Sequence, residues 1–304
     1  MAISRTQLVK ELEPGLNALF GLEYKRYENQ HAEIYTTESS DRAFEEEVML
    51  SGFANAQVKA EGQGVSFDTA QETYTARYTH DTVALAFAIT EEAIEDNLYD
   101  RLASRYTKAL ARSMSNAKQV KAVTPLNNGL PSTDTFDSGD AVSLFSTNHT
   151  TVSGTAVKNT LTTQADLNET SLEQALIDIA GMTDERGLRV AARGMKMVIP
   201  SANQFNAERL MKSPGRTGTA DNDINAVASM GMIPQGYRVN NFLTDTDSWY
   251  IITDVPNGMK MFQRAALKTA MEGDFDTGNV RYKARERYSF GVSDFRGIFG
   301  VEGA

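Results

Sequence analysis

The stretch VRYKARERYSFGVSDFRGIFG, residues 280–300, decides the fold more than any other part of this chain. Apolar side chains fall at alternate positions from residue 280 to residue 292, and they are Val280, Tyr282, Ala284, Tyr288, Phe290 and Val292. The positions between them hold Arg281, Lys283, Arg285 and Arg287. This period of two predicts a single β-strand, about 40 Å long, with one packed face and one wet, basic face. Because ordinary strands run to about five or six residues, we expect an extended structure here and not a compact pocket.

The composition indicates a folded, soluble protein. The chain has 304 residues, 41% hydrophobic and 23% charged, which suffices for a large core in one or two domains. No run of apolar residues is long enough to predict a membrane span, and we expect no secretory signal because the first residues lack its apolar core. The absence of cysteine excludes disulfides, a cysteine nucleophile and thiolate metal sites. Stability must therefore come from packing or from assembly.

The charge of the chain is acidic overall and unevenly placed. A net charge of −10 argues against a general nucleic-acid binder, because such proteins neutralise phosphates with Lys and Arg. Glu45, Glu46 and Glu47 form an acidic cluster, and residues 281–287 form a basic stretch. The two are either solvated faces or complementary patches that meet between subunits.

The first third of the chain predicts an arm followed by a hairpin. Leu8, Leu12, Leu16 and Leu19 make a narrow apolar stripe on a helix over residues 3–21, and Pro14 predicts a kink or two short helices. Two β-type runs then flank a turn at Gly62 and Gly64, within residues 48–83. A polar hairpin of this length is unstable alone. We therefore expect Tyr74, Tyr78 and the turn at residues 62–64 to be held by neighbouring subunits rather than by their own chain.

A long helix is predicted over residues 90–124. Thr90 is a plausible N-cap, and an apolar face follows, made of Ile94, Leu98, Leu102, Tyr106, Ala109, Leu110, Met114, Ala117 and Val120. Lys118 and Lys121 would complement the C-terminal end of the helix dipole, and Pro125 would prevent continuation. At 1.5 Å per residue the helix spans about 45 Å. We expect Ile94, Leu98, Leu102 and Leu110 to pack against the sheet that bears Tyr282, Tyr288 and Phe290.

The middle of the chain is rich in loops and mixes helices with strands. A capping box from Thr170 to Glu173 predicts a helix as far as about Arg186, and residues 195–199 and 249–253 predict buried strands. A helix is expected to open at residues 201–204. The mixture indicates an α+β fold and not alternating βαβ units.

No catalytic, cofactor or metal site is predicted. The only histidines are His31, His80 and His149, and none has a partner at metal-ligand spacing. His80 beside Asp81 is expected to be solvated, because it lies in the polar hairpin. The chain shows no nucleophile elbow, Walker loop or dinucleotide-binding glycine pattern. The sequence therefore favours a protein that is not an enzyme.

The end of the chain resembles a known family. A long basic and aromatic strand that closes on DFRGIFG, with Phe295 and Phe299 as its aromatic positions, is similar to the C-terminus of tailed-phage major capsid proteins, and most of all to the phage Mu major head subunit group. The phrase AITEEAIEDNLYD, residues 88–100, resembles that family's approach to its spine helix. The resemblance implies a Hong Kong 97-type α+β fold. Its parts would be an N-terminal arm at 1–47, an extended loop at 48–83, a peripheral domain with the spine helix at 84–124 and closing strands at 263–304, and an axial domain at 125–262.

The resemblance also implies a function. A major capsid protein would assemble with itself as hexamers and pentamers into an icosahedral shell around the phage genome, in the virion, after assembly in the host cytoplasm. Scaffolding, portal and cement proteins are partners that such a shell can need, and DNA would be enclosed without sequence-specific binding or any membrane. The acidic cluster, or packaged DNA, would then neutralise the charges of Arg285 and Arg287. Two alternatives remain open: an encapsulin-like bacterial nanocompartment shell, and a soluble enzyme or binding protein of unrelated α+β fold.

Overall fold

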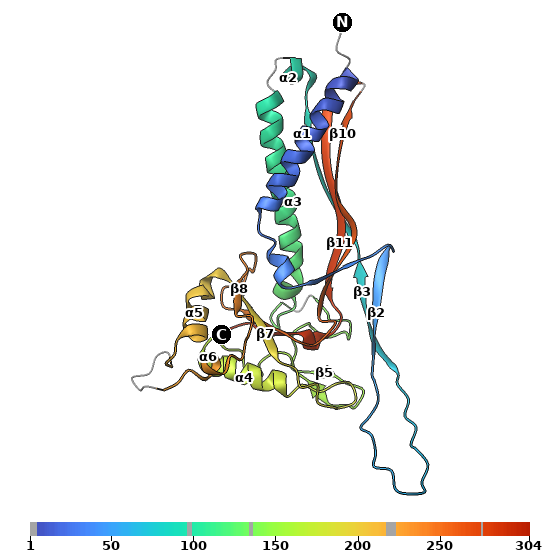
Figure 1. Cartoon of the computed structure of the whole chain (residues 1–304), viewed down its shortest axis with the longest axis vertical. Coiled ribbons are helices and arrows are strands. Elements are labelled where there is room, and N and C mark those ends of the chain that lie inside the picture. The colour runs from blue at the N-terminus through green and yellow to red at the C-terminus, as the bar shows by residue number, and fades with distance from the viewer. Residues whose placement is uncertain (1–4, 96–98, 134–135, 217–222, 275) are drawn as a thin grey trace.

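The computed structural model describes residues 5–95, 99–133, 136–216, 223–274 and 276–304. Its helices are α1 (Arg5–Arg26), α2 (Glu91–Glu95), α3 (Tyr99–Asn128), α4 (Glu169–Ala180), α5 (Gln204–Lys212) and α6 (Ala226–Met230). Its strands are β1 (Thr36–Ser39), β2 (Phe44–Leu50), β3 (Glu72–Thr79), β4 (Asp81–Ile89), β5 (His149–Thr150), β6 (Ala156–Val157), β7 (Gly194–Ile199), β8 (Tyr237–Val239), β9 (Trp249–Thr253), β10 (Met259–Gly273), β11 (Val280–Val292) and β12 (Ile298–Val301). Figure 1 shows an elongated module of long helices and strands, a compact module at one end of it, and a hairpin that stands beside both.

The elongated module is built on a sheet with the strand order β1-β10-β11-β4. β11 spans the residues that the alternating pattern predicted, and it pairs antiparallel with β10 on one side and with β4 on the other. Val280, Tyr282, Ala284 and Tyr288 are buried on one face, while Arg281, Lys283 and Arg285 are exposed on the other. The prediction of one packed and one wet face is therefore confirmed.

Helices α1 and α3 run along the packed face of this sheet (Figure 1). Their shared core contains Phe20 from α1, Leu110 and Met114 from α3, and Tyr282 and Ala284 from β11. The predicted contact of Leu110 with the sheet is confirmed. The side chains of Ile94, Leu98 and Leu102, for which the same contact was predicted, lie outside the described residues.

Both long helices contain an internal proline, which corrects the prediction that Pro125 prevents continuation and the alternative of two short helices at Pro14, while a kink at Pro14 stays a prediction. Pro14 lies inside the single helix α1, and Pro125 lies inside α3, which continues to Asn128. Pro125 lies in the last turn of α3, where its missing N–H costs the helix one backbone hydrogen bond to the carbonyl four residues earlier. Leu126, directly after it, is fully buried in a core cluster. Tertiary packing thus outweighs the local preference to end the helix.

The predicted apolar face of α3 is partly wrong. Val120 and Tyr106 are each 48% exposed, whereas Lys118 is buried. The buried stripe includes polar residues, among them Thr107, Ser115, Lys118 and Gln119, which sequence hydrophobicity does not mark. Lys118 therefore does not complement a helix end but faces the sheet, where it has an acidic partner.

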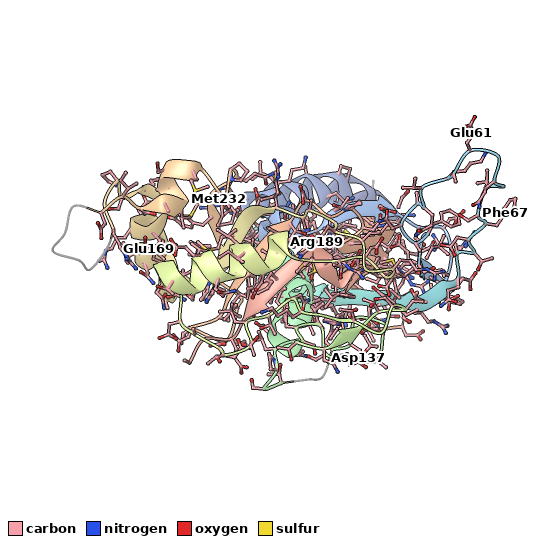
Figure 2. All side chains as sticks on the ribbon, turned by 90° about the horizontal axis from the view of Figure 1, so that it is seen from below. Glu61, Phe67, Asp137, Glu169, Arg189 and Met232 are labelled. Atoms are coloured by element: carbon pink, nitrogen blue, oxygen red, sulfur yellow. The ribbon has the colours of Figure 1, made fainter. Side chains whose placement is uncertain are left out.

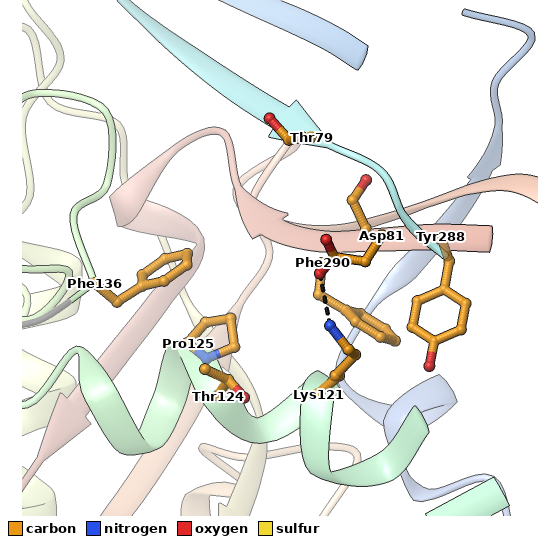
Figure 3. A pocket seen from close by; sticks show the side chains of 9 residues that line it. Thr79, Asp81, Lys121, Thr124, Pro125, Phe136, Tyr288 and Phe290 are labelled. Atoms are coloured by element: carbon orange, nitrogen blue, oxygen red, sulfur yellow. Dashed lines mark hydrogen bonds and ion pairs between the residues drawn. The ribbon is translucent and has the colours of Figure 1, made fainter. Parts of the chain in front are cut away.

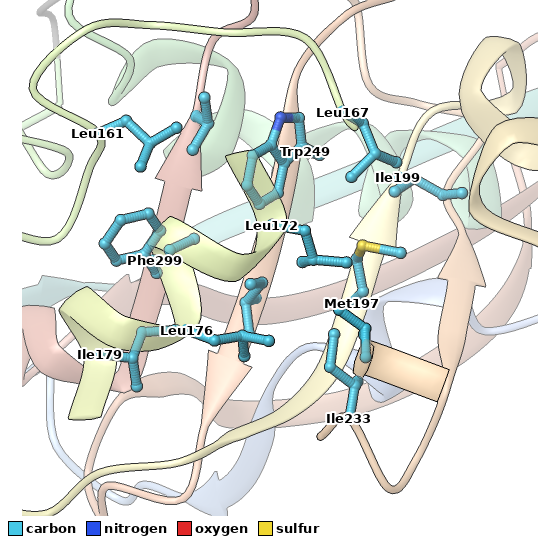
Figure 4. Packing of buried hydrophobic residues seen from close by; sticks show 14 of the residues in the cluster. Leu161, Leu167, Leu172, Leu176, Ile179, Met197, Ile199, Ile233, Trp249 and Phe299 are labelled. Carbon is cyan, nitrogen blue, oxygen red and sulfur yellow. The ribbon is translucent and has the colours of Figure 1, made fainter. Parts of the chain in front are cut away.

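The compact module holds the second sheet, with the order β12-β9-β7-β8, packed against α4, α5 and α6. Figure 4 shows its core, in which Trp249 and Phe299 from the sheet meet Leu172 and Leu176 from α4. The strand predictions at 195–199 and 249–253 are confirmed. The helix α4 is shorter than predicted.

Asn168, and not Thr170, caps the start of α4. The Asn168 side chain accepts from the Ser171 backbone, and the Ser171 hydroxyl accepts from the Asn168 backbone. The helix ends at Ala180, where Gly181 forms the C-cap. The remaining residues of the expected helix form a turn closed by the bridge between Thr183 and Arg189.

Candidate assembly surfaces

The hairpin β2–β3 carries an outer loop, residues 51–71, that stands away from the rest of the chain (Figures 1 and 2). Gly62 turns the loop with a φ of +80°, a conformation that glycine adopts without steric strain. Figure 2 shows Glu61 and Phe67 at the far end of this loop. The side chains of Val58 and Phe67 are 100% and 98% exposed, and Phe53 and Val65 are exposed as well. The outer loop thus presents bulky apolar groups that its own chain does not cover.

The base of the hairpin, in contrast, is held by its own chain. Tyr78 is 3% exposed, its ring packs edge-on against Phe262 with centroids 4.8 Å apart, and its hydroxyl bonds to the hydroxyl of Ser293. Tyr74 donates to the Ser293 carbonyl over 3.4 Å. Gly291 makes room, since a Cβ there would lie 2.6 Å from the Tyr78 ring. The expectation that neighbouring subunits alone hold Tyr74 and Tyr78 is therefore wrong, because both tyrosines face β11 and the turn after it.

Burial also changes the acidity of these two tyrosines. The pKa of Tyr78 and the pKa of Tyr74 are both raised, chiefly because burial disfavours the phenolate. Both side chains therefore stay neutral donors. The turn at Gly62 and Gly64 is different, since a Cβ at either glycine would meet nothing within 4 Å.

The acidic cluster does not form one free patch. Glu45 accepts from the Ser40 hydroxyl over 2.6 Å, and Glu47 lies 2.5 Å from Lys260, which also pairs with Glu38. Glu46 points to the other face of β2 and lies 3.8 Å from Arg77. Alternation along a strand separates the three carboxylates, because neighbours point to opposite faces. Each already has a partner in its own chain.

The basic face of β11 is only partly compensated. Arg281 pairs with Asp274 over 2.5 Å, whereas Arg285 and Arg287 form no ion pair with any carboxylate that the structure describes. Arg287 is half-buried, and its Nε lies 3.5 Å from the His80 carbonyl oxygen. Across the ladder to β4 the basic side chains stand opposite small residues, namely Ala88, Ala86, Ala84 and Thr82. Across the ladder to β10, Arg281 stands opposite Glu272 and Arg285 opposite Lys268. Arg285 is exposed and is therefore accessible to an anionic partner.

Two buried ionic groups were not predicted from the sequence. Glu286 lies on the packed face of β11, where its carboxylate meets Lys118 at 3.2 Å and the Tyr24 hydroxyl at 3.5 Å. Burial raises the pKa of the Glu286 carboxyl, and Lys118 opposes that rise. Its position in the alternation, between Ala284 and Tyr288, is the signal that could have found it. A charged residue at a packed position needs a buried counter-ion.

The second buried group is centred on Arg296, which is 3% exposed. Its guanidinium lies 2.5 Å from Glu185 and 3.1 Å from Asp294, and it donates to the Thr183 carbonyl over 2.8 Å. These bonds tie the turn after α4 to the segment between β11 and β12. They fix how the compact module joins the elongated one.

All three histidines are buried, which corrects the prediction that His80 is solvated. His80 bonds to the hydroxyls of Ser40 and Ser289. The His149 ring stacks on Phe295 with centroids 3.9 Å apart, and its Nδ1 lies 2.6 Å from Asp140. Within the described ranges no group of three or more histidine, aspartate or glutamate side chains could hold a metal ion. The histidines thus join segments of the fold.

A small cavity lies between the long sheet and the end of α3, and Figure 3 shows it from close by. It holds about 150 Å³ and is lined by Pro125, Phe136 and Phe290, with the Asp81–Lys121 ion pair of 2.6 Å at its side. The volume suffices for a few water molecules. The cavity is too small for the substrate of an ordinary enzyme.

Comparison with known proteins matches this architecture to capsids. The chain matches a family described as phage capsid protein over residues 73–301. No curated protein matches the chain. Among solved structures, a virus-like particle from Pyrococcus furiosus shares 10% identity at a TM-score of 0.54, and the match covers 94% of this chain and 98% of the other.

Two further structures are similar. The capsid of an empty GTA particle shares 13% identity at a TM-score of 0.55, with 91% of each chain covered. The capsid of Myoviridae phage XM1 shares 11% identity at a TM-score of 0.52, with 89% of each covered. At such identities the likeness shows the fold alone. That fold is the Hong Kong 97-type capsid fold expected from the sequence.

The fold and the family match together define a capsid protein. This chain belongs to the phage capsid protein family. Membership favours a structural role in the virion over an encapsulin-like compartment or an unrelated soluble enzyme. No helix in the described part of the chain is both long and apolar enough to cross a membrane.

Proposed function

We propose that this chain is the major head subunit of a tailed phage, and that its copies close into an icosahedral shell of hexamers and pentamers around DNA. The observation that carries the proposal is the uncovered outer loop. Residues 51–71 extend from a well-packed base, and their bulky apolar side chains are 60% to 100% exposed. A second copy of the chain is the partner that the proposal assigns to them.

The energetics of the outer loop favour a partner. Burying a Val or Phe side chain is worth about 1.5–3 kcal/mol. Val58, Val65 and Phe67 leave that gain unused in the isolated chain. A shell repeats the same contact many times, so modest contacts between neighbours add up to a stable particle.

Deletion of residues 60–67 tests this role directly. The deletion removes the end of the outer loop but keeps β2, β3 and the seat of Tyr78. The protomer should therefore keep its circular dichroism and its melting temperature, yet form no particles in negative stain. Phe67→Ser should weaken assembly in the same way. Ile177→Ser, which changes an apolar residue that is 65% exposed on α4, is the matched control. Normal shells from the deletion would contradict the proposal.

We propose a second contact between subunits on the basic face of β11. Arg285 and Arg287 would meet the acidic cluster of a neighbouring chain, through Glu45 and Glu46 in addition to Glu47. Glu46 is the best placed of the three, because its side chain is 46% exposed and its own partner lies as far as 3.8 Å away. The net charge of −10 favours carboxylates over DNA as the occupant, since DNA gains little from an acidic wall.

Charge removal tests this second contact. Arg285→Gln with Arg287→Gln should weaken assembly most at low salt, where screening is slight. Arg42→Gln with Arg193→Gln, which changes two exposed arginines elsewhere, is the control. Adding Glu45→Gln and Glu46→Gln should restore assembly if the acidic cluster is the partner. A loss of DNA packaging with normal shell formation would assign the basic face to DNA instead. Normal assembly and DNA packaging at every ionic strength would mean that the basic face of β11 contacts only solvent.

The remaining parts of the proposal follow from the family. The N-terminal arm (1–47), extended loop (48–83), peripheral domain (84–124 and 263–304) and axial domain (125–262) are the proposed divisions. The subunit performs no catalysis and assembles in the host cytoplasm. A portal protein is a proposed partner, as are scaffolding and cement proteins where closure of the shell requires them. DNA is enclosed without sequence-specific contacts.

A further inference from the structure

The hairpin joins the long sheet through two short connections that meet at one histidine. On one side β1 ends at Ser39 and β2 begins at Phe44. On the other side His80 is the single residue between β3 of the hairpin and β4 of the sheet. The direction in which the outer loop points therefore depends on the backbone at these two places, together with the contacts of Tyr74 and Tyr78 with Ser293.

The side chain of His80 bridges both connections and the central strand. Its Nε2 lies 2.9 Å from the hydroxyl of Ser40, and its Nδ1 lies 2.9 Å from the hydroxyl of Ser289 on β11. His80 is 5% exposed. Ser40 is itself fixed, since its backbone N–H donates to the Gln263 carbonyl of β10 over 3.1 Å.

The hydrogen bonds around His80 run in one direction. The Ser40 hydroxyl donates to the Glu45 carboxylate over 2.6 Å, so its oxygen is left to accept from Nε2–H of His80. The bare Nδ1 then accepts from the Ser289 hydroxyl. The neutral ring with its proton on Nε2 satisfies every member of this chain.

We propose that His80 is the positioning residue of the extended hairpin, holding the outer loop at the angle from which it can reach a neighbouring subunit, and that protonation of His80 releases this angle. The part of this inference that concerns assembly rests on the proposed function. The effect of His80 on the angle of the hairpin does not. Histidine suits the position because one planar ring donates in one direction and accepts in the other.

The charges around the ring make its protonation disruptive. Arg287 of β11 and Arg264 of β10 face the ring with like charge, and only Glu45 of β2 opposes them. Burial, followed by Arg287, lowers the pKa of His80. A protonated ring would also donate from Nδ1, so the Ser289 hydroxyl, which donates in the neutral network, would have to rotate and accept. Acidification below the usual histidine pKa of about 6.5 should therefore loosen the bridge.

A distance measurement tests the angle without relying on assembly. The chain contains no cysteine, so Val48→Cys on β2 of the hairpin and Ile177→Cys on α4, both at exposed positions, give two sites for spin labels. Labelled full-length protein, diluted with unlabelled chain and taken from the unassembled fraction, should show one narrow distance distribution at about pH 7.5, and a broad one at about pH 5, on either side of the usual histidine range. The distance distribution of the His80→Ala variant should be broad at both pH values.

A second variant separates the bridge from simple loss of stability. His80→Gln offers an amide N–H to Ser40 and an amide oxygen to Ser289, so it can keep both anchors, but it cannot be protonated. Its distance distribution should therefore stay narrow at both pH values, without the acid-induced broadening. Ser289→Ala should broaden the distribution by removing one of the two anchors. A narrow distribution in His80→Ala, or acid broadening that persists in His80→Gln, would overturn the inference.

The outcomes also distinguish this inference from the proposed function. If His80→Ala broadens the distribution and deletion of residues 60–67 leaves assembly normal, the angle is set by His80 and the proposed role of the loop in assembly is wrong. If deletion of residues 60–67 abolishes particles while His80→Ala stays narrow, the loop is needed and His80 does not set its direction.

Discussion

The Nζ atom of Lys118 lies 3.2 Å from Oε2 of Glu286, and both side chains are buried between the long helix and the central strand. The Tyr24 hydroxyl of α1 lies 3.5 Å from each carboxylate oxygen. One buried pair thus joins α1, α3 and β11, the three elements that form the length of the elongated module. A buried pair is weak evidence for stability, but breaking it leaves an uncompensated charge.

Removal of one partner of this pair should strongly lower the free energy of unfolding. Glu286→Gln leaves the Lys118 ammonium without its counter-ion, and we expect a loss of about 3–5 kcal/mol in unfolding free energy. The double change Lys118→Met with Glu286→Leu should cost much less, because apolar groups of similar size replace the pair. Urea denaturation of the single and double variants measures both. A double variant that is less stable than Glu286→Gln would contradict this explanation.

Acid should destabilise the fold through His31. Burial, and next the charge of Lys118, lower the pKa of His31 to about 4, while Gln119 opposes them. The unfolded chain binds this proton near pH 6.5. The stability contributed by neutral His31 is therefore complete above about pH 6.5 and is lost as the pH falls toward 4, by about 3 kcal/mol.

His31→Phe isolates this pH dependence. The ring of His31 packs edge-on against Phe290 at 5.9 Å, so phenylalanine keeps an aromatic contact without a titratable group. The difference in unfolding free energy between the variant and the natural protein should grow in favour of the variant as the pH falls from 6.5 to 4. A difference that does not change with pH would mean that His31 is protonated equally in both states.

The register of α3 can be checked with two substitutions on the same helix. Leu110 is 4% exposed and packs in the core with Tyr282, so Leu110→Ala should cost about 2–5 kcal/mol. Val120 is 48% exposed, and Val120→Ala should change stability by less than about 0.5 kcal/mol. Equal losses from the two in chemical denaturation would mean that the helix is rotated from the described position.

The position of the Tyr78 ring over Gly291 predicts that a side chain at residue 291 lowers the stability of the fold. A Cβ at Gly291 would lie 2.6 Å from the Tyr78 ring, so Gly291→Ala should cost about 1–3 kcal/mol as the ring is pushed away. Gly273 ends β10 with nothing within 4 Å of a Cβ, and Gly273→Ala is the matched control. Thermal unfolding of both variants provides the measurement. A tolerated Gly291→Ala would mean that the tyrosine is not seated as described.

The long strand and helix could be predicted because each repeats one simple period over many residues. The alternation from Val280 to Val292 matches β11 along its full length. The apolar face of α3 was less accurate, since polar residues such as Thr107 and Lys118 are buried there and Val120 is not. Hydrophobicity alone cannot mark a buried lysine whose partner, Glu286, lies 168 residues away.

The surfaces were harder to predict than the elements. The outer loop was recognised because a long polar hairpin lacks a core of its own, but Tyr78 was assigned to a neighbour since nothing in the sequence shows that Phe262 and Ser293 receive it. The acidic cluster was judged as one patch, whereas alternation in β2 gives its members different partners. The first error comes from contacts between segments far apart in sequence, and the second from overlooking the alternation of side chains along β2.

Imaging of the purified full-length protein tests the central claim most directly. Size-exclusion chromatography followed by negative-stain electron microscopy should show closed particles of uniform size, eluting far ahead of a single chain. A subunit whose outer loop needs a neighbour should be rare as a free species at the concentrations used. Protein that elutes only as a 33.4 kDa monomer, with neither particles nor smaller assemblies at any salt concentration or pH that preserves the fold, would contradict the proposal that copies of this chain bind one another to build a shell.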